Sequence, residues 1–172
     1  IFFIFKIIRY KNATDLGEII GKIFGPLFRS NEKILKNLEN SKVGNSDNDR
    51  KIIIKKMWGN YGRIFAEYIY LKNFRENNLS SNVKIVGQEI LEKIKKNNEP
   101  VIFISGHFNN FELMAMQLEM AGVDLAAIYR PLNNIFLNPF IEKIRKNYIC
   151  KKQIKKGISG AKEALKYFNQ GT

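Results

Sequence analysis

The chain is poor in the side chains that build metal and redox sites. Its 172 residues include one cysteine, Cys150, and one histidine, His107. A single cysteine excludes an internal disulfide and suits a reducing compartment without requiring one. We expect Cys150 to be a small packed residue rather than a nucleophile. A structural zinc site takes about four cysteine or histidine ligands, so we expect no metal. We find no phosphate-binding glycine loop and expect no cofactor.

Acidic residues are also few. The chain has 29 lysines and arginines against 16 aspartates and glutamates, which gives a formal net charge of +13. This excess is compatible with nucleic acid, with an anionic membrane surface, and with an acidic protein or phosphorylated substrate. Because most aromatic residues fall in apolar helical stripes rather than among basic residues on a strand face, nucleic acid is not the expected partner.

The apolar run at the start of the chain is too short to cross a membrane. Residues 1–8 are apolar apart from Lys6, and Arg9 and Lys11 follow them. A membrane helix needs about 20 apolar residues. The run is compatible with the end of a membrane helix, with a basic cytoplasmic flank, and equally with a core or interfacial helix.

Helices are predicted over most of the first 75 residues. Residues 15–25 have apolar side chains at helical spacing and a glycine at every fourth position, which allows close helix contact in a membrane or in a core. We expect Pro26 to end this helix and Ser30 to cap a short helix up to Leu38. A polar loop over residues 41–49 precedes a long helix over residues 50–74. The three glycines are Gly17, Gly21 and Gly25.

The long helix has an aromatic and apolar stripe that we interpret as core, with contact to a cofactor or acyl chain as the alternative. Its Gly59 and Gly62 disfavour a helix unless another segment packs closely against them. A short strand over residues 83–86 and a helix over residues 88–96 are predicted to follow.

The central stretch, residues 100–131, has the pattern of a βαβ unit. A short apolar run at residues 101–104 predicts a buried strand. Asn109 or Asn110 then caps a helix that starts near Phe111, and a second strand is expected within residues 123–129. Such strands are parallel with a right-handed crossover. A helix from about residue 138, a strand near residues 148–150 and a final helix over residues 159–168 complete the predicted α/β fold.

Two polar residues come directly after the predicted strands. His107 follows the first strand and Arg130 follows the second, so both should lie at the carboxyl edge of the sheet, where ligands bind in open α/β folds. If His107 lies in the turn before the helix and Glu112 in its first turn, the carboxylate can orient the imidazole as a base. Direct deprotonation of a substrate hydroxyl is then the simplest chemistry, and Arg130 could stabilise an oxyanion or hold a phosphate. Alternatively, His107 is only a turn or capping residue.

The segment SGHFNNFELM resembles the signature of the bacterial lipid A biosynthesis acyltransferases, the late lauroyl and myristoyl transferases. That signature is a strand, Gly-His, a pair of small or amide residues, an aromatic residue and an acid. The resemblance extends over nearly the whole chain. It includes the segments RKIIIKKMWGNYGRIFAEYIYL, VKIVGQEIL and IYRPLNN.

The resemblance implies a catalytic role for His107 as general base with Glu112 as its partner. Asn110, Arg130 and Arg145 would belong to the substrate or oxyanion site. The implied fold is a three-layer α/β/α sandwich with a mainly parallel sheet, similar to glycerolipid acyltransferases, preceded by N-terminal helices. We expect residues 1–40 to be a membrane-associated segment with a truncated anchor, and residues 50–172 to be an acyltransferase domain that is incomplete at its C-terminus.

The implied reaction is the transfer of a fatty acyl chain to a hydroxyl group. The donor would be acyl carrier protein, the acceptor a lipid A precursor, and the place the cytoplasmic face of the bacterial inner membrane. One alternative is an acyltransferase of the same superfamily that acts on another glycolipid or phospholipid. A second is a basic, non-catalytic protein that binds membranes or nucleic acid.

Overall fold

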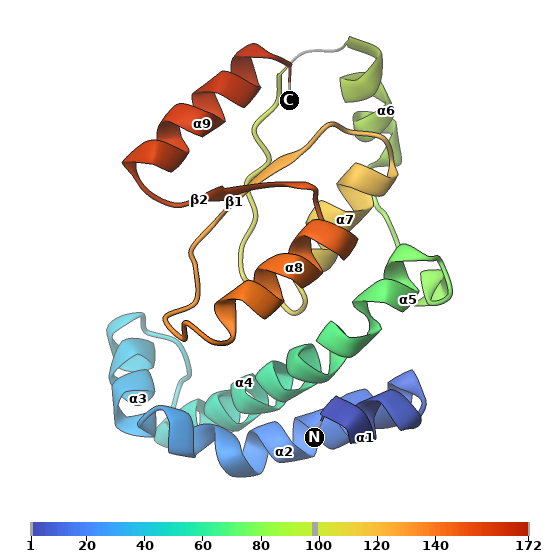
Figure 1. Cartoon of the computed structure of the whole chain (residues 1–172). Coiled ribbons are helices and arrows are strands. Elements are labelled where there is room, and N and C mark those ends of the chain that lie inside the picture. The colour runs from blue at the N-terminus through green and yellow to red at the C-terminus, as the bar shows by residue number, and fades with distance from the viewer. Residues whose placement is uncertain (1, 98–99, 172) are drawn as a thin grey trace. The chain divides into compact units, whose positions relative to one another are not determined.

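Most helices predicted from apolar spacing are present in the computed structural model (Figure 1), but the long helix expected over residues 50–74 ends at Glu67 and is followed by a 3-10 turn and a short helix. The structure describes residues 2–97 and 100–171. Ile1 of the expected anchor segment and Thr172 at the end of the expected domain lie outside the described residues. The chain forms two units, Ile1–Tyr70 and Leu71–Thr172, which are described in turn.

The first unit is entirely helical. It contains α1 (Phe2–Ile7), α2 (Tyr10–Phe28), α3 (Asn31–Asn40), α4 (Asp47–Glu67) and the 3-10 turn η1 (Tyr68–Tyr70). Ser30 caps α3 as predicted, because its Oγ accepts a hydrogen bond of 3.2 Å from the backbone N–H of Glu32. The prediction that Pro26 ends α2 is wrong. Proline removes one backbone donor, and α2 continues past it to Phe28 before the backbone becomes extended at Arg29.

Glycines set the distance between α2 and α4, which lie side by side (Figure 1). A Cβ atom on Gly62 would lie 1.9 Å from the carbonyl oxygen of Gly17. A Cβ atom on Gly21 would lie 2.2 Å from the carbonyl oxygen of Trp58. No side chain fits at such distances, so the two backbones touch directly. The close contact predicted from the glycine spacing is confirmed.

The first unit also contains a small apolar core, formed by residues of α1, α2 and α4. Phe5, Ala13 and Ala66 are buried together. The Tyr70 hydroxyl lies 2.6 Å from the carbonyl oxygen of Phe5 and 2.5 Å from that of Ile8, and burial raises the pKa of this hydroxyl. These bonds tie η1 to α1 in a water-poor environment.

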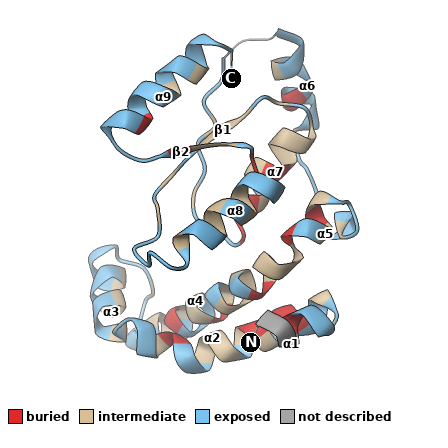
Figure 2. Ribbon diagram, viewed as in Figure 1, coloured by how far each residue is buried: buried red, intermediate tan, exposed pale blue. Residues whose placement is uncertain are grey.

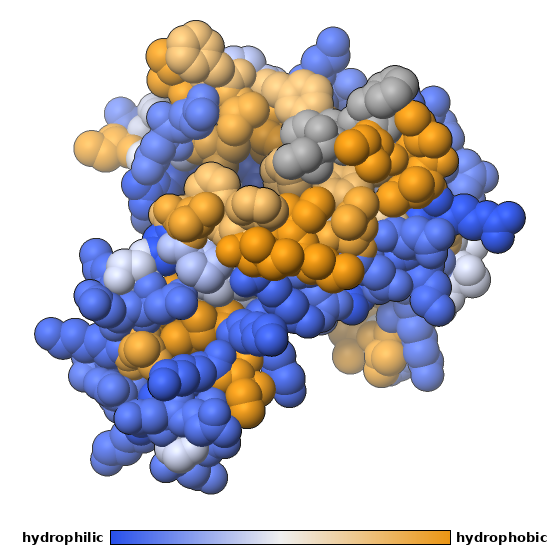
Figure 3. Space-filling view, turned by 90° about the horizontal axis from the view of Figure 1, so that it is seen from below, coloured by the Kyte–Doolittle hydropathy of each residue, from blue (hydrophilic) through white to orange (hydrophobic). Residues whose placement is uncertain are grey.

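The C-terminal half of α2 carries several exposed apolar side chains. Figure 3 shows apolar patches among hydrophilic side chains on the side of the molecule seen from below. The most exposed large apolar residues of α2 are Ile23, Leu27 and Phe28, at 61%, 79% and 85%. In the described part of the chain, no helix has the length and apolar content needed to cross a membrane.

The second unit combines helices with a small parallel sheet. Its elements are α5 (Leu71–Arg75), η2 (Ser80–Asn82), α6 (Gln88–Asn97), α7 (Glu112–Met120), β1 (Ala126–Tyr129), α8 (Asn138–Tyr148), β2 (Lys152–Lys155) and α9 (Ile158–Asn169). Strand β1 pairs in parallel with β2, from Ala126 opposite Lys152 to Tyr129 opposite Lys155. Helix α8 connects the two strands, as parallel pairing requires.

Three expected strands differ from the structure. Residues 83–86 and 101–104 are not in strands, and the pairing expected at residues 148–150 occurs later, at β2. An apolar run signals burial, whereas a strand also needs a partner for its backbone groups. Ile102 and Ile104 are in fact 75% and 91% exposed. The described residues therefore form a mixed α/β fold with a two-stranded parallel sheet.

The core of the second unit gathers residues from α5, α7 and the segment that leads into β2 (Figure 2). Cys150 is 1% exposed, and its Sγ lies 2.8 Å from the carbonyl oxygen of Leu125. Burial raises the pKa of this thiol, which disfavours the nucleophilic thiolate. The packed role predicted for Cys150 is confirmed. The other most deeply buried residues here are Leu71, Phe74, Met116, Ile149 and Ile154.

Candidate active site

A tight turn leads from the His107 segment into α7. Asn109 has φ +45°, in the left-handed region that asparagine tolerates better than most residues. The carbonyl oxygen of Asn109 accepts a hydrogen bond from the N–H of Phe111 at 3.1 Å. Helix α7 then begins at Glu112, close to the expected position. Its N-cap is Phe111, without a side-chain cap, so the capping role expected for Asn109 or Asn110 is wrong.

The structure places His107 before the helix and Glu112 in its first turn, the arrangement that the proposed dyad requires. The His107 side chain is exposed, and its ring packs on that of Phe111 with the ring centroids 4.3 Å apart and the planes tilted by 54°. An exposed imidazole held against an aromatic ring is accessible to a substrate. The hydrogen bond between His107 and Glu112 stays a prediction.

Glu112 is a buried carboxylate that binds Arg145. Its Oε1 accepts hydrogen bonds from Nε of Arg145 at 2.8 Å and from Nη2 at 2.5 Å. The Glu112 side chain is buried, at 6% exposure, and the Arg145 side chain is mostly covered, at 12%. Removal of one partner from an ion pair of this kind strongly destabilises the folded protein, because the other charge stays buried without compensation. Arg145, for which the resemblance implies a place in the substrate site, therefore fixes the Glu112 carboxylate.

The other predicted site residues are distributed along the same unit. Asn110 is 9% exposed and lies in the turn that starts α7, whereas Arg130 is exposed and directly follows β1. His107 and Arg130 can share one sheet edge only if residues 101–104 form a strand of that sheet. Because the described segment is not in the sheet, only Arg130 lies at that edge.

A polar cluster that the sequence did not predict lies next to Arg145. The Arg145 guanidinium lies over the ring of Tyr129, 5.5 Å from its centroid. The Tyr129 hydroxyl donates a hydrogen bond of 2.6 Å to Glu142. Asn138 donates to the same carboxylate oxygen at 2.7 Å, and Lys155 pairs with it at 3.2 Å. In the sequence, only the spacing of Asn138 and Glu142, one helical turn apart, indicates that two members of this cluster can be in contact.

This cluster shifts the pKa of both of its acidic groups. Burial, followed by the bond to Glu142, raises the pKa of Tyr129. Chiefly because of the hydrogen bond from Tyr129, the pKa of Glu142 is lowered to about 2. Glu142 is therefore a carboxylate at neutral pH and holds β1, α8 and β2 together. Its neighbour Arg145, three residues along α8, connects this cluster to Glu112.

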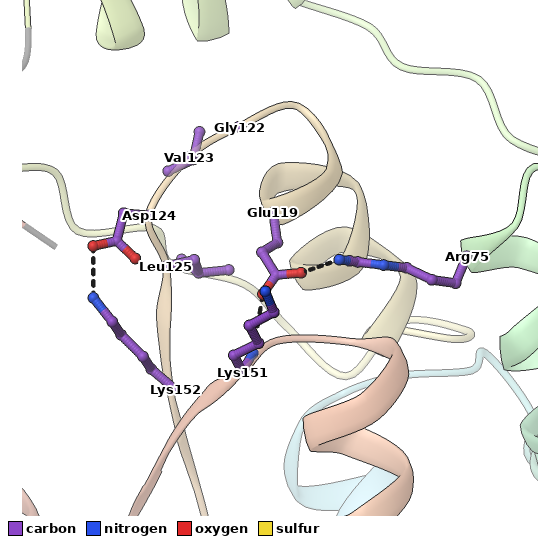
Figure 4. Close-up of a pocket in the computed structure, with 8 residues that line it drawn as sticks. All are labelled: Arg75, Glu119, Gly122, Val123, Asp124, Leu125, Lys151 and Lys152. Atoms are coloured by element: carbon purple, nitrogen blue, oxygen red, sulfur yellow. Dashed lines mark hydrogen bonds and ion pairs between the residues drawn. The ribbon is translucent and has the colours of Figure 1, made fainter.

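A polar cavity of about 290 Å³ lies at the other end of α7 (Figure 4). Glu119 accepts a hydrogen bond of 3.0 Å from the backbone N–H of Lys151 and pairs with Nη2 of Arg75 at 2.5 Å. Lys152 pairs with Asp124 at 2.6 Å. These two ion pairs connect α5 with α7 and Asp124 with β2, and Lys151 adds a further basic side chain to the lining.

A second cavity, of about 470 Å³, is lined mainly by apolar side chains of α6, α7 and the segments before them. It shares α7 with the candidate site, since Leu113 follows Glu112 directly. No group of histidine, cysteine, aspartate and glutamate side chains among the described residues is arranged to hold a metal ion.

The chain is similar to a known protein family. The family described as bacterial lipid A biosynthesis acyltransferase matches residues 1–172. No curated protein and no solved structure matches the chain.

Proposed function

Because the chain belongs to the bacterial lipid A biosynthesis acyltransferase family, we propose that it transfers a fatty acyl chain from acyl carrier protein to a hydroxyl of a lipid A precursor. The family itself supports a transferase of acyl groups. The identities of the thioester donor and of the lipid acceptor are our proposal. The basic excess of the chain, +13, is compatible with an acidic carrier protein and a phosphorylated lipid.

The observation that carries the proposal is the position of Glu112. It is a buried carboxylate, held by two hydrogen bonds from Arg145, in the first turn of the helix that follows the exposed His107. A carboxylate fixed in this way can orient a neighbouring imidazole and stabilise its protonated form. His107 is the only histidine of the chain, so no other imidazole competes for the role of base.

The reaction has two chemical steps. His107 takes the proton of the acceptor hydroxyl, and the oxygen attacks the thioester carbonyl to form a tetrahedral oxyanion. The oxyanion then collapses, the carbon–sulfur bond breaks, and His107 returns the proton to the leaving thiolate. Backbone N–H groups at the start of α7 favour negative charge. We propose that Arg130 and Asn110 assist in holding the oxyanion or substrate, and that Arg145 acts on substrate besides positioning Glu112.

We also propose that the protein works on the cytoplasmic face of the inner membrane. The exposed apolar side chains of α2, which include Ile23, Leu27 and Phe28, support this location. An amphipathic helix with basic residues nearby binds the surface of a membrane without crossing it. Lys11 and Arg29 supply such charges on or beside α2.

For the acyltransferase domain we retain the three-layer α/β/α arrangement as a proposal. The parallel pairing of β1 with β2 and the apolar, exposed residues 101–104 support a wider sheet. Hydrogen exchange of the amides of residues 101–104 tests it, because paired strands protect their N–H groups. Rapid exchange of these amides in the membrane-bound enzyme would contradict the wider sheet.

The first experiment follows the product by mass. Membranes that contain the protein receive acyl carrier protein thioester and a lipid A precursor, and His107→Ala is compared with the native chain. We expect the gain of one acyl chain, and a loss of about 10²- to 10⁴-fold in rate for the variant, because general base catalysis contributes this much. Near-native turnover by His107→Ala would refute the mechanism.

Ser105→Ala is the matched control, two residues away. The Ser105 hydroxyl bonds to the Gly106 carbonyl and has no role in the proposed reaction, so its removal should leave the rate unchanged. A large loss in this variant would point to a serine nucleophile and an acyl-enzyme. Thioester consumption that depends on His107, without acylation of the precursor, would replace the acceptor with another lipid.

A further inference from the structure

The two hydrogen bonds from Arg145 to Glu112 converge on a single oxygen atom. Both Nε and Nη2 of Arg145 donate to Oε1 of Glu112, at 2.8 and 2.5 Å. A fork-to-fork pair uses both carboxylate oxygens and so fixes the orientation of the two planar groups. Two bonds to one oxygen constrain this orientation less. Other contacts of the guanidinium therefore contribute to how firmly Glu112 is held.

The ring of Tyr129 supplies such a contact. The guanidinium carbon of Arg145 lies 5.5 Å from the ring centroid, within the roughly 6 Å at which a cation is attracted to an aromatic face. Tyr129 is the last residue of β1, and Arg145 lies on α8. A planar guanidinium can stack on an aromatic ring, which a lysine ammonium group cannot do. The ring thus limits the positions that the guanidinium can take.

The Tyr129 side chain is itself held at both ends. On the backbone side, β1 pairs with β2, and Tyr129 lies opposite Lys155. At the other end, the hydroxyl donates a hydrogen bond of 2.6 Å to Glu142, whose carboxylate also accepts a bond from Asn138 and pairs with Lys155. Because its hydroxyl is bound to Glu142, this tyrosine is better suited to support Arg145 than to exchange a proton with a substrate.

We propose that Tyr129 is a positioning residue of the candidate active site. Its ring, fixed through Glu142, keeps the Arg145 guanidinium on Glu112, and Glu112 in turn orients His107. The proposal rests on the proposed acyl transfer and extends the groups that support it to the end of β1. No atom of Tyr129 takes part in the reaction, so loss of the ring should slow the chemical step without weakening the binding of substrate.

Two substitutions separate the ring from its hydroxyl. Tyr129→Phe and Tyr129→Leu both remove the hydrogen bond to Glu142, but only Tyr129→Leu also removes the aromatic face. Tyr129→Leu should lower kcat by about tenfold to a hundredfold with little change in KM, because a misplacement of about 1 Å in an active site costs up to about 10²-fold. Tyr129→Phe should lose far less. Equal kcat values for the two variants, or a change confined to KM, would overturn the proposal.

Tyr167→Leu is the matched control. Tyr167 on α9 forms the same kind of contact, with Nζ of Lys152 5.0 Å from the ring centroid, but Lys152 pairs with Asp124, outside the candidate dyad. The variant should therefore keep the native kcat. A loss as large as that of Tyr129→Leu would mean that the reaction is sensitive to packing anywhere in this unit, and would overturn the proposal. Far-UV circular dichroism establishes that each variant is folded.

A double-mutant cycle with Arg145→Lys tests whether Tyr129 acts through Arg145. Lysine keeps a positive charge beside Glu112 but lacks the planar fork. If the ring supports the guanidinium, Tyr129→Leu should lower kcat by a smaller factor in the Arg145→Lys background than in the native chain, because the effects of interacting residues are not additive. Equal factors in both backgrounds would show that the two residues act independently, and would overturn the proposal.

The same cycle followed by urea denaturation needs no catalysis. The shift in the unfolding midpoint caused by Tyr129→Leu, measured against that of Tyr129→Phe, should be smaller in the Arg145→Lys background. If no acyl transfer is detected but this coupling is present, the proposed function fails while the support of Arg145 by Tyr129 stands. If the coupling is absent, Tyr129 does not hold Arg145, and the proposal fails even in an active enzyme.

Discussion

Each of the two units is stabilised by a different kind of internal contact. In the first unit, α2 and α4 are in contact through glycines. A Cβ atom added to Gly62 would lie 1.9 Å from the backbone carbonyl oxygen of Gly17. In the second, a buried ion pair joins α7 to α8 through Glu112 and Arg145. Close backbone contact tolerates no added volume, whereas a buried ion pair tolerates no unbalanced charge. Each unit should therefore be sensitive to a different kind of substitution.

Charged groups occur in both units, but their surroundings differ. In the first unit, Glu18 forms ion pairs with Lys22 and Arg63, whose side chains are 30% and 43% exposed. The hydrogen bonds from Lys22 and Arg63 lower the pKa of Glu18. Water screens such pairs, so they contribute little. Arg145 is only 12% exposed, and its charge is balanced mainly by the protein.

The largest effect on stability is expected from Arg145→Ala. This substitution leaves the Glu112 carboxylate buried without its ion-pair partner, which should cost about 3–5 kcal/mol of unfolding free energy. Urea denaturation followed by circular dichroism measures the loss. The control is Arg63→Ala in the first unit, which should cost at most about 1 kcal/mol. Equal losses would remove the distinction between the two units.

A second substitution separates a missing charge from missing volume. In the Arg145→Ala background, Glu112→Gln removes the unbalanced charge and should restore part of the stability. Activity should not return, because the neutral amide cannot stabilise a protonated His107. No recovery of stability would mean that Arg145 stabilises the unit through packing.

The next effect is steric and falls on the first unit. Gly62→Ala forces α2 and α4 apart and should cost about 1–3 kcal/mol or more, as overpacking does. Gly59→Ala, on the same helix, meets only the flexible side chains of Glu18 and Lys22, at 2.9 Å. The gain in helix propensity, about 0.5–1 kcal/mol, should offset most of its cost. Thermal unfolding measures the stability of both variants. Equal stability of the two would mean that α2 and α4 are not in close contact at Gly62.

The two units should also differ in their contribution to membrane binding, with a smaller effect of each substitution. Leu27→Ser removes an exposed apolar side chain from α2 and should weaken binding to anionic lipid vesicles about tenfold, because burying a leucine contributes about 1.5–3 kcal/mol. Ile158→Ser, equally exposed on α9 of the second unit, should have no effect. Sedimentation with vesicles measures both. A loss in the Ile158 variant alone would place the membrane surface on the second unit.

The smallest effect is a pH dependence in the second unit. The hydrogen bond from Tyr129 lowers the pKa of Glu142 to about 2 in the folded chain, from an ordinary value of 4.5. A lowered folded-state pKa stabilises the fold above the ordinary value, and this contribution is lost as the pH falls to about 2. Glu142→Gln should therefore destabilise the chain at neutral pH and have little effect near pH 2.

The control for this pH dependence is Glu163→Gln on the exposed surface of α9. Urea denaturation at both pH values gives the difference in unfolding free energy for each variant. If the Glu142 and Glu163 variants lose the same stability at both pH values, the cluster around Tyr129 does not stabilise the carboxylate.

Local patterns in the sequence predicted features that depend on neighbours along the chain. The glycine spacing predicted the close helix contact, and Ser30 predicted its cap. The position of Glu112 in the first turn of a helix that starts near Phe111 was also expected, whereas the left-handed backbone at Asn109 was not. These are interactions within a few residues or along one helix face, where the periodicity of the chain determines geometry.

Features that depend on distant pairing were decided by the tertiary structure. Residues 101–104 have the composition of a buried strand, yet no described strand pairs with them, whereas residues 152–155 form β2 despite three polar side chains. Nor does any local pattern show that Arg145, 33 residues away, binds Glu112. The sequence by itself determined most of the helices, the close helix contact and the family. Only the tertiary structure determined which strands pair and which charge balances the carboxylate, because both depend on groups far apart along the chain.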